Sequence, residues 1–291
     1  MLNKKRIFLI IFSLFFFLIS FNSISYANYS TNFNSSNIQL ISPSINNLEG
    51  DNFFIIEGFS IYNKVWACAR TPDNKLVIYG IDVIDGKFKK VLPLRFGPGT
   101  YTIWVSDNQN YFDGSIRFEI INNSTKDIRY SSPSYFIDSD NQFIIDLISQ
   151  IIIPEMNDME KILIIHNWIT NNISYDYNKY LYGSIQTSTA SQTLLNKKGV
   201  CQDYSLLMAA MARASGLEAR VVYGQGLQNN IWQSHGWNEI KVNDQWITID
   251  STWDAGYIQN GLFIFSPSMK YFNANNDFFS LTHYSLSYMN Y

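Results

Sequence analysis

The chain has 291 residues, of which 46% are apolar and 16% aromatic, enough large side chains for two ordinary domain cores. Its formal net charge is −3 at pH 7 and its pI is about 5.6. No basic cluster follows the first residues, so this charge balance argues against nucleic acid as a partner.

The first residues have the pattern of a secretory signal peptide. A basic region at 4–6 is followed by an apolar run at 7–19 and by the small-x-small sequence SYA at 25–27. The apolar run is shorter than the ~20 residues that span a bilayer. We therefore expect cleavage near Ala27, with no stable membrane insertion afterwards. The mature protein, from Asn28, is expected to be secreted and extracellular or associated with the cell wall.

After a polar stretch at 28–37, residues 38–122 are predicted to form β structure throughout. Short strand-like runs such as KVWACART and TYTIWVSD are separated by Gly, Pro, Asn and Asp at the spacing of an all-β sandwich of the immunoglobulin-like kind. The region has no histidine and no acidic cluster with metal-ligand spacing, so we expect a spacer or binding module. Cys68 is expected to be a buried strand residue that acts as a small hydrophobe.

Residues 123–139 form a predicted polar linker, after which the apolar period becomes helical. The runs FIIDLISQII and MEKILIIHNWITNNI have helical spacing, and Asp158 is the expected N-cap of the second. We expect structural roles for His166, within that helix, and for His283. Strand-like runs follow later, so residues 140–291 are predicted to form an α+β domain.

The stretch GVCQDYSLLMAAMARASG predicts a helix that begins at Cys201 and stops before Gly216. A free thiol is a weak nucleophile at neutral pH because thiol pKa values lie near ~8.5. Two features correct this weakness: a helix N-terminus, which stabilises an anion, and a nearby imidazole, which accepts the proton. Cys201 has the first feature by its position in the sequence.

A hairpin is predicted for HGWNEIKV and QWITIDST, with a two-residue turn at 243–244. This turn pairs Val242 with Gln245 and makes His235 and Asp250 diagonal neighbours on one face. An odd-length loop would instead turn them to opposite faces. A carboxylate beside an imidazole fixes its tautomer and stabilises the imidazolium. Taken singly, His235 is more commonly a satisfied core histidine and Asp250 a strand-end cap.

Three motifs in order resemble those of the transglutaminase-like superfamily, which has a papain-like fold and includes transglutaminases, bacterial cysteine proteases and peptide N-glycanases. They are G-x-C opening a helix, H-x-W in a strand and D-x-T-W in the next, and the resemblance runs from about Tyr130 onwards. Family members often have proline where Ser251 stands. The resemblance implies that Cys201 is the nucleophile, His235 the general base and acid, and Asp250 the orienting carboxylate.

The oxyanion hole has one natural donor, the backbone N–H of Cys201. The family's second donor is an upstream side chain, for which Tyr175 and Gln192 are the candidates; packing in the core is the alternative for Tyr175. Trp237 and Trp253 either line the cleft or pack in the core.

The expected architecture is an α+β papain-like transglutaminase-core domain preceded by an all-β sandwich domain. The expected activity is thiolate attack on an amide or peptide carbonyl of a protein or peptide substrate, with a thioester intermediate. Water resolves the thioester in a protease or amidase, and an amine resolves it in a transglutaminase. We favour water, because only 34 residues (235 − 201) separate Cys201 from His235, which leaves little chain for walls that exclude water.

No cofactor is expected, and no metal, since one Cys, one His and one Asp are too few for a closed zinc site. The alternative from another class is a non-catalytic cell-wall or surface binding protein that keeps the fold.

Overall fold

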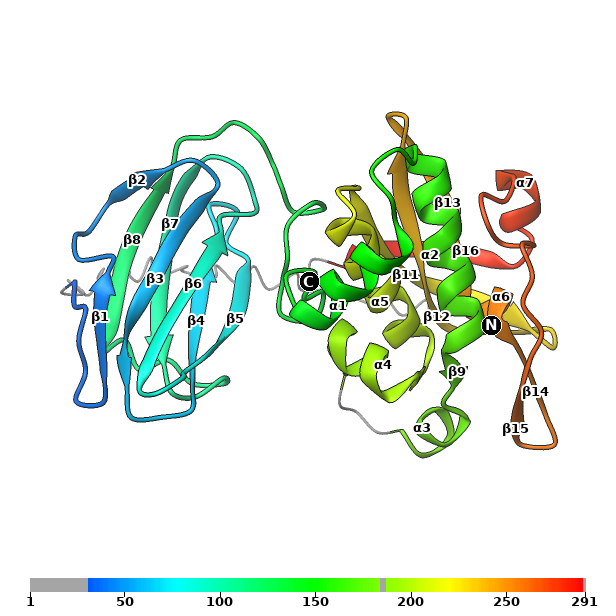
Figure 1. Cartoon of the computed structure of the whole chain (residues 1–291), viewed down its shortest axis with the longest axis horizontal. Coiled ribbons are helices and arrows are strands. Elements are labelled where there is room, and N and C mark those ends of the chain that lie inside the picture. The colour runs from blue at the N-terminus through cyan, green and yellow to red at the C-terminus, as the bar shows by residue number, and fades with distance from the viewer. Residues whose placement is uncertain (1–30, 184–186, 290–291) are drawn as a thin grey trace, which may run out of the picture. The chain divides into compact units, whose positions relative to one another are not determined.

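The computed structural model describes residues 31–183 and 187–289 (Figure 1). The predicted signal peptide, residues 1–27, lies outside these described residues. Within the described ranges, no helix has both the length and the apolar character needed to cross a membrane.

The β structure between residues 38 and 122 forms two sheets that face each other across one apolar core. One sheet has the order β1-β3-β6, and the other has the order β2-β8-β7-β4-β5. Alternating apolar and polar residues along each strand explain the sandwich, because successive side chains point to opposite faces of a sheet. In β8, for example, Ile116, Phe118 and Ile120 are buried, and the two residues between them are only partly buried. The strands are β1 Ile38–Ser42, β2 Leu48–Gly50, β3 Phe53–Ser60, β4 Lys64–Arg70, β5 Leu76–Asp82, β6 Lys87–Pro93, β7 Gly99–Ser106 and β8 Ile116–Asn122.

Cys68 lies in β4 as a free, buried thiol, which confirms its predicted placement. Burial raises the pKa of Cys68 to about 11. This thiol is therefore protonated and unreactive near neutral pH.

The second part of the chain is an α+β arrangement in which helix α5 packs on an antiparallel sheet of order β13-β12-β11-β16 (Figure 1). Its early elements are α1 Gln142–Ile151, α2 Asp158–Asn172, β9 Ser174–Tyr175, α3 Tyr177–Tyr182, α4 Ala190–Asn196, β10 Lys198–Gly199 and α5 Cys201–Ala214. Its later elements are β11 Ala219–Gln228, β12 Ile231–Val242, β13 Gln245–Ile249, α6 Ser251–Ala255, β14 Gly256–Gln259, β15 Leu262–Phe265, α7 Asn276–Phe279 and β16 His283–Met289.

Helix α2 begins one residue away from the predicted cap. Asn157, rather than Asp158, is the N-cap: its side chain accepts the Glu160 N–H at 3.0 Å, and the Glu160 carboxylate accepts the Asn157 N–H at 2.8 Å. This reciprocal capping box satisfies two backbone donors, whereas Asp158 as the cap would have no such partner three residues later. His166, on the same helix, is fully buried with its Nε2 3.0 Å from Asp254 Oδ2.

The β12–β13 hairpin has the predicted register, with Val242 opposite Gln245. Asn243 and Asp244 have φ values of 49° and 61°, the left-handed pair that a two-residue primed turn requires. The predicted second strand is too long, however. It ends at Ile249, because the Asp250 side chain accepts two backbone N–H groups ahead of it and so starts helix α6.

Candidate active site

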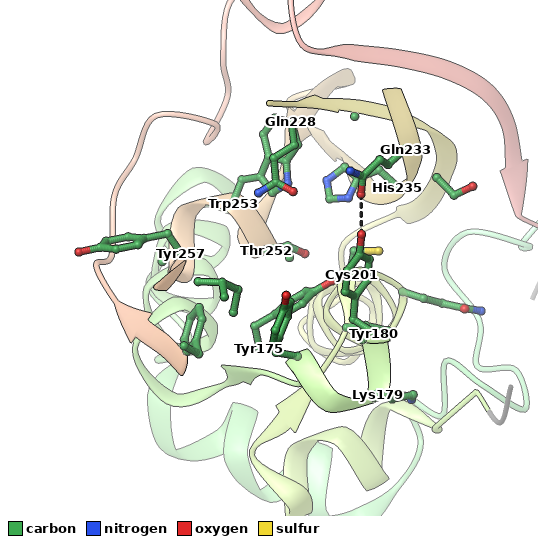
Figure 2. Close-up of a pocket in the computed structure, with 18 of the residues that line it drawn as sticks. Tyr175, Lys179, Tyr180, Cys201, Gln228, Gln233, His235, Thr252, Trp253 and Tyr257 are labelled. Carbon is green, nitrogen blue, oxygen red and sulfur yellow. Dashed lines mark hydrogen bonds between the residues drawn. The ribbon is translucent and has the colours of Figure 1, made fainter. Parts of the chain in front are cut away.

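The thiol of Cys201 lies at the first turn of α5 and lines a cavity of about 660 Å³ (Figure 2). The preceding Val200 is extended, and its N–H donates to Asp203 Oδ2 at 2.9 Å, which fixes the helix start. The first N–H groups of a helix have no partner within the helix and favour negative charge nearby. The sequence prediction that Cys201 begins a helix is therefore confirmed.

In the first turn of α5, two residues after the thiol, Asp203 is held in a buried ion pair. Its side chain is almost fully buried, and its two oxygens lie 3.0 and 2.7 Å from Lys179 Nζ. A Cβ on Gly199 would lie 2.5 Å from the Cβ of Asp203, so glycine is required here for the carboxylate to fit under the helix start. The glycine of the G-x-C motif thus admits Asp203 into the first turn.

His235 lies on β12 with its Nε2 2.7 Å from Asp250 Oδ2, and both side chains are buried. Burial alone would lower the pKa of His235, but the charge and hydrogen bond of Asp250, with a smaller contribution from a hydrogen bond to Cys201, raise it to about 10. Burial likewise acts to raise the pKa of Asp250, but His235 and His283 hold it well below its usual value. At neutral pH the pair is therefore an imidazolium beside a carboxylate.

Glycine at 226, on the neighbouring strand β11, lets the imidazole approach. A Cβ on Gly226 would lie 3.2 Å from two ring carbons of His235 and 2.8 Å from Trp253. Trp253 stacks on the His235 ring, with centroids 4.9 Å apart and an interplanar angle of 28°. The imidazole of His235 is thus held between Gly226 of β11 and the indole ring of Trp253. Its Nε2 faces Asp250, and the ring also reaches Cys201.

Of the other predicted residues, Tyr175 and Trp253 line the cavity. Burial, and to a lesser extent Cys201, raises the pKa of Tyr175, so its hydroxyl keeps its proton and is available as a donor. Figure 2 shows Tyr175 on the Cys201 side of the cavity and Trp253 on the opposite side.

Two predicted cleft residues do not reach the cavity. Gln192 is exposed at the start of α4, where its Oε1 accepts the Thr189 N–H at 2.9 Å in a capping box. Because Gln192 is exposed and does not line the cavity that holds Cys201, its amide N–H groups are not placed to stabilise an oxyanion there. Trp237 is buried behind His235, with ring centroids 6.0 Å apart, in a small apolar cluster with Phe279.

Sequence reasoning missed His283. It was predicted to have a structural role, and the structure places its Nε2 3.2 Å from Asp250 Oδ2, the oxygen that also contacts His235. It also missed Tyr180, whose hydroxyl donates to Gln233 Oε1 at 2.7 Å beside Cys201 (Figure 2, dashed line). No local pattern marks either residue, because their partners lie 33 and 53 positions away.

His235, Asp250 and His283 offer ligand atoms within 4.8 Å of one another. Each histidine, however, directs Nε2 at the carboxylate, and a nitrogen that donates a proton has no lone pair for a metal ion. The three residues are therefore arranged as a carboxylate, Asp250, with hydrogen bonds from two histidines, and not as a metal site.

Comparison with known proteins finds one matching family pattern and several similar proteins. The sequence pattern of the Transglutaminase-like superfamily matches residues 145–251, the part of the chain that runs from α1 to the start of α6. With α5 packed on the antiparallel sheet, residues from α1 to β16 form a papain-like transglutaminase core. The all-β sandwich precedes it.

Similar curated proteins are the kyphoscoliosis peptidases of Mus musculus and Homo sapiens, each 27% identical over 149 residues. These matches cover 48% of this chain and only 22% of the relatives' length. Among solved structures, a candidate cysteine protease from Cytophaga hutchinsonii is 17% identical, with a TM-score of 0.38 over 77% of this chain and 69% of that one. Red sea bream transglutaminase is 11% identical, with a TM-score of 0.29 over 74% and 50% of the two chains.

Proposed function

We propose that the protein is a cysteine-dependent acyl-transfer enzyme that hydrolyses amide or peptide bonds in a protein or peptide substrate. The observation that carries the proposal is the joint placement, at one cavity, of a thiol at a helix start and a buried imidazolium–carboxylate pair. Either feature alone is common in structural roles, but their combination at a cleft is the arrangement of a nucleophilic thiolate with an imidazolium that has taken its proton.

The first half of the reaction follows from this placement. The Cys201 thiolate attacks the substrate carbonyl carbon, and the C=O π electrons move to oxygen. The backbone N–H of Cys201 and the Tyr175 hydroxyl are the donors placed to stabilise this oxyanion. As the C–N bond breaks, His235 gives its proton to the leaving amine, and a thioester remains.

The second half regenerates the thiolate. Water attacks the thioester and gives its proton to His235, and the C–S bond breaks to release a carboxylic acid. Asp250 keeps the imidazole oriented and stabilises its charged form throughout.

Two observations favour water over an amine as the acceptor. Tyr180 and Tyr257, which line the cavity, have 48% and 52% of their surface exposed, so the cavity is open where an amine-specific tunnel would need closed walls. The curated relatives are also named as peptidases. Transamidation is the alternative outcome, for which Trp253 and Phe263 supply part of an aromatic wall.

The test is a competition assay with the Cys201→Ala variant as the matched control. A glutamine-containing peptide is offered with and without a primary amine, and ammonia release, peptide cleavage and amine incorporation are measured together. Hydrolysis should exceed incorporation, and an adduct one acyl group heavier should be trapped on Cys201 and be absent from the variant. Faster incorporation would make the enzyme a transglutaminase, and no adduct with any amide substrate would favour the non-catalytic binding protein.

We further propose that the protein acts outside the cytoplasm, after removal of a signal peptide. The support is the sequence pattern of residues 4–27. Sequencing the N-terminus of protein exported from its host should find Asn28 or a near neighbour; intact Met1 on membrane-bound protein would contradict the proposal.

A further inference from the structure

The Asp250 carboxylate accepts four hydrogen bonds and has no exposed surface for water. Oδ1 accepts the backbone N–H groups of Thr252 and Trp253 at 2.9 and 3.2 Å. Oδ2 accepts from His235 at 2.7 Å and from His283 at 3.2 Å. The mechanism above uses only the His235 bond, so the second histidine is a buried polar group without an assigned role.

His283 is held in place on every side. It is 5% exposed, its ring stacks on Phe279 with centroids 3.8 Å apart and an angle of 20°, and Trp253 lies 4.4 Å away by the same measure. Its backbone is the first residue of β16, paired with Gly226 of β11. The ring therefore cannot turn away from Asp250 without breaking the packing that surrounds it.

The hydrogen bonds of His283 define which of its two ring nitrogens carries the proton. Its Nε2 faces a carboxylate, which can only accept, so Nε2 is protonated. Its Nδ1 lies 2.9 Å from the Thr282 hydroxyl, whose other acceptor, the Phe279 carbonyl oxygen, is farther away at 3.4 Å, so the hydroxyl proton is directed to Nδ1. A neutral, Nε2-protonated His283 thus satisfies both nitrogens, and a second cation beside the imidazolium of His235, 5.5 Å away between centroids, is avoided.

We propose that His283 is a positioning residue of the active site: by donating to the same oxygen of Asp250 as His235 does, it fixes the carboxylate and limits how tightly the carboxylate retains the imidazolium proton. The inference rests on the proposed function, because it assigns His283 a role in tuning the base and acid of that reaction. A carboxylate that shares its charge with a second donor attracts the His235 proton less strongly. His235 can then release that proton to a leaving amine.

Other titratable groups lie near the His235–Asp250 pair and affect the same proton. They are Cys201 from α5, Tyr175 from β9, Tyr204 from α5 and Tyr271 from the segment after β15, together with the Lys179–Asp203 ion pair. The tyrosines at 175 and 204 have raised pKa values because of burial, and so carry no charge near neutral pH. Removing His283 therefore changes the environment of Asp250 without changing the charge of either tyrosine.

Two substitutions separate the hydrogen bond from the packing. His283→Phe keeps an aromatic ring against Phe279 and removes the donor. His283→Gln offers an amide N–H close to the position of Nε2 and restores a donor without the ring. Folding of each variant is checked by near-ultraviolet circular dichroism.

The readout is a pH titration of the histidine rings by NMR of protein labelled with ¹⁵N-histidine, which needs no substrate. In the wild type, His283 should carry its proton on Nε2 alone at neutral pH. In His283→Phe, the midpoint of His235 should rise by about one pH unit, since the carboxylate loses one of its donors. In His283→Gln it should return most of the way to the wild-type value.

The proposal is overturned if wild-type His283 carries its neutral-form proton on Nδ1, an outcome that requires no variant to fold. It is also overturned if His283→Phe leaves the His235 midpoint unchanged, or if both variants shift it equally. Failure of the proposed enzymatic function would appear separately, as the absence of a Cys201 acyl adduct in wild-type protein whose His283 still shows the expected tautomer and coupling.

Discussion

Replacing Lys179 by methionine should destabilise the protein strongly, because it leaves the buried carboxylate of Asp203 without its countercharge. The Asp203 side chain is 2% exposed and that of Lys179 15% exposed, so solvent screens the pair only weakly. Removing one partner of a buried ion pair typically costs about 3–5 kcal/mol. Asp203 still accepts the hydrogen bond from the Val200 N–H and still lies at the favourable start of a helix, which together stabilise its charge by up to about 1 kcal/mol. We therefore expect the free energy of unfolding to fall by about 3 kcal/mol.

The measurement is urea unfolding of four proteins: wild type, Lys179→Met, Asp203→Asn and the double variant. Asparagine keeps a side-chain oxygen for the Val200 N–H and removes the charge, so it is the matched partner substitution. The double variant should be more stable than Lys179→Met alone, because its buried carboxylate is gone. The coupling free energy from this cycle should reach about 2 kcal/mol or more.

A loss below about 1 kcal/mol for Lys179→Met would refute the reasoning, since it is the size expected for an exposed ion pair. Equal effects of Lys179→Met in the wild-type and Asp203→Asn backgrounds would do the same, because the lysine would then act through its alkyl chain.

Three further outcomes are expected. Because the folded pKa of His235, about 10, lies above the unfolded value of ~6.5, its contribution to stability is complete below pH ~6.5 and is lost as pH rises towards 10; urea unfolding should show a fall of about 3 kcal/mol between pH 7 and 10 that His235→Gln abolishes. Gly199→Ala should cost about 1–3 kcal/mol in the same assay because its Cβ meets Asp203, whereas Gly236→Ala, whose Cβ meets only an ordinary contact at 3.4 Å, should cost less than about 1 kcal/mol. Iodoacetamide at pH 7.5 should alkylate Cys201 much faster than Cys68, as read by peptide mass mapping, and equal rates would contradict the assignment of the nucleophile.

The parts of the site that the sequence predicted well are those defined by local rules. The turn at 243–244 sets the register of β12 against β13. The position of Cys201 in the first turn of α5 follows from the glycine-containing loop and the apolar helical pattern on either side of it. Asp250 was predicted near His235, although as a strand residue. Its real position at the N-cap of α6 brings Oδ2 to the imidazole from beyond the end of the ladder.

The parts that sequence reasoning missed depend on contacts between distant segments. Nothing in the local sequence around His283 distinguishes it from His166, since both are isolated histidines in mixed surroundings. The fold brings each to a different aspartate, Asp250 and Asp254, on opposite ends of the same short helix. The prediction for Gln192 was wrong for the opposite reason: its spacing from Thr189 encodes a local capping box, which keeps the side chain at the start of α4 and away from the cavity.

Strand β16 is last in chain order, and its first residue donates to the carboxylate that orients the imidazole. The strand pairs with β11, some 60 residues earlier, so it docks only after the rest of the sheet exists. During synthesis, a chain that has emerged only as far as α7 already contains the thiol, the imidazole and Asp250, but lacks the partner that completes the carboxylate's shell. In such a chain the Asp250 carboxylate would have three hydrogen-bond donors instead of four, so the orientation of the imidazole depends on the order in which the strands dock.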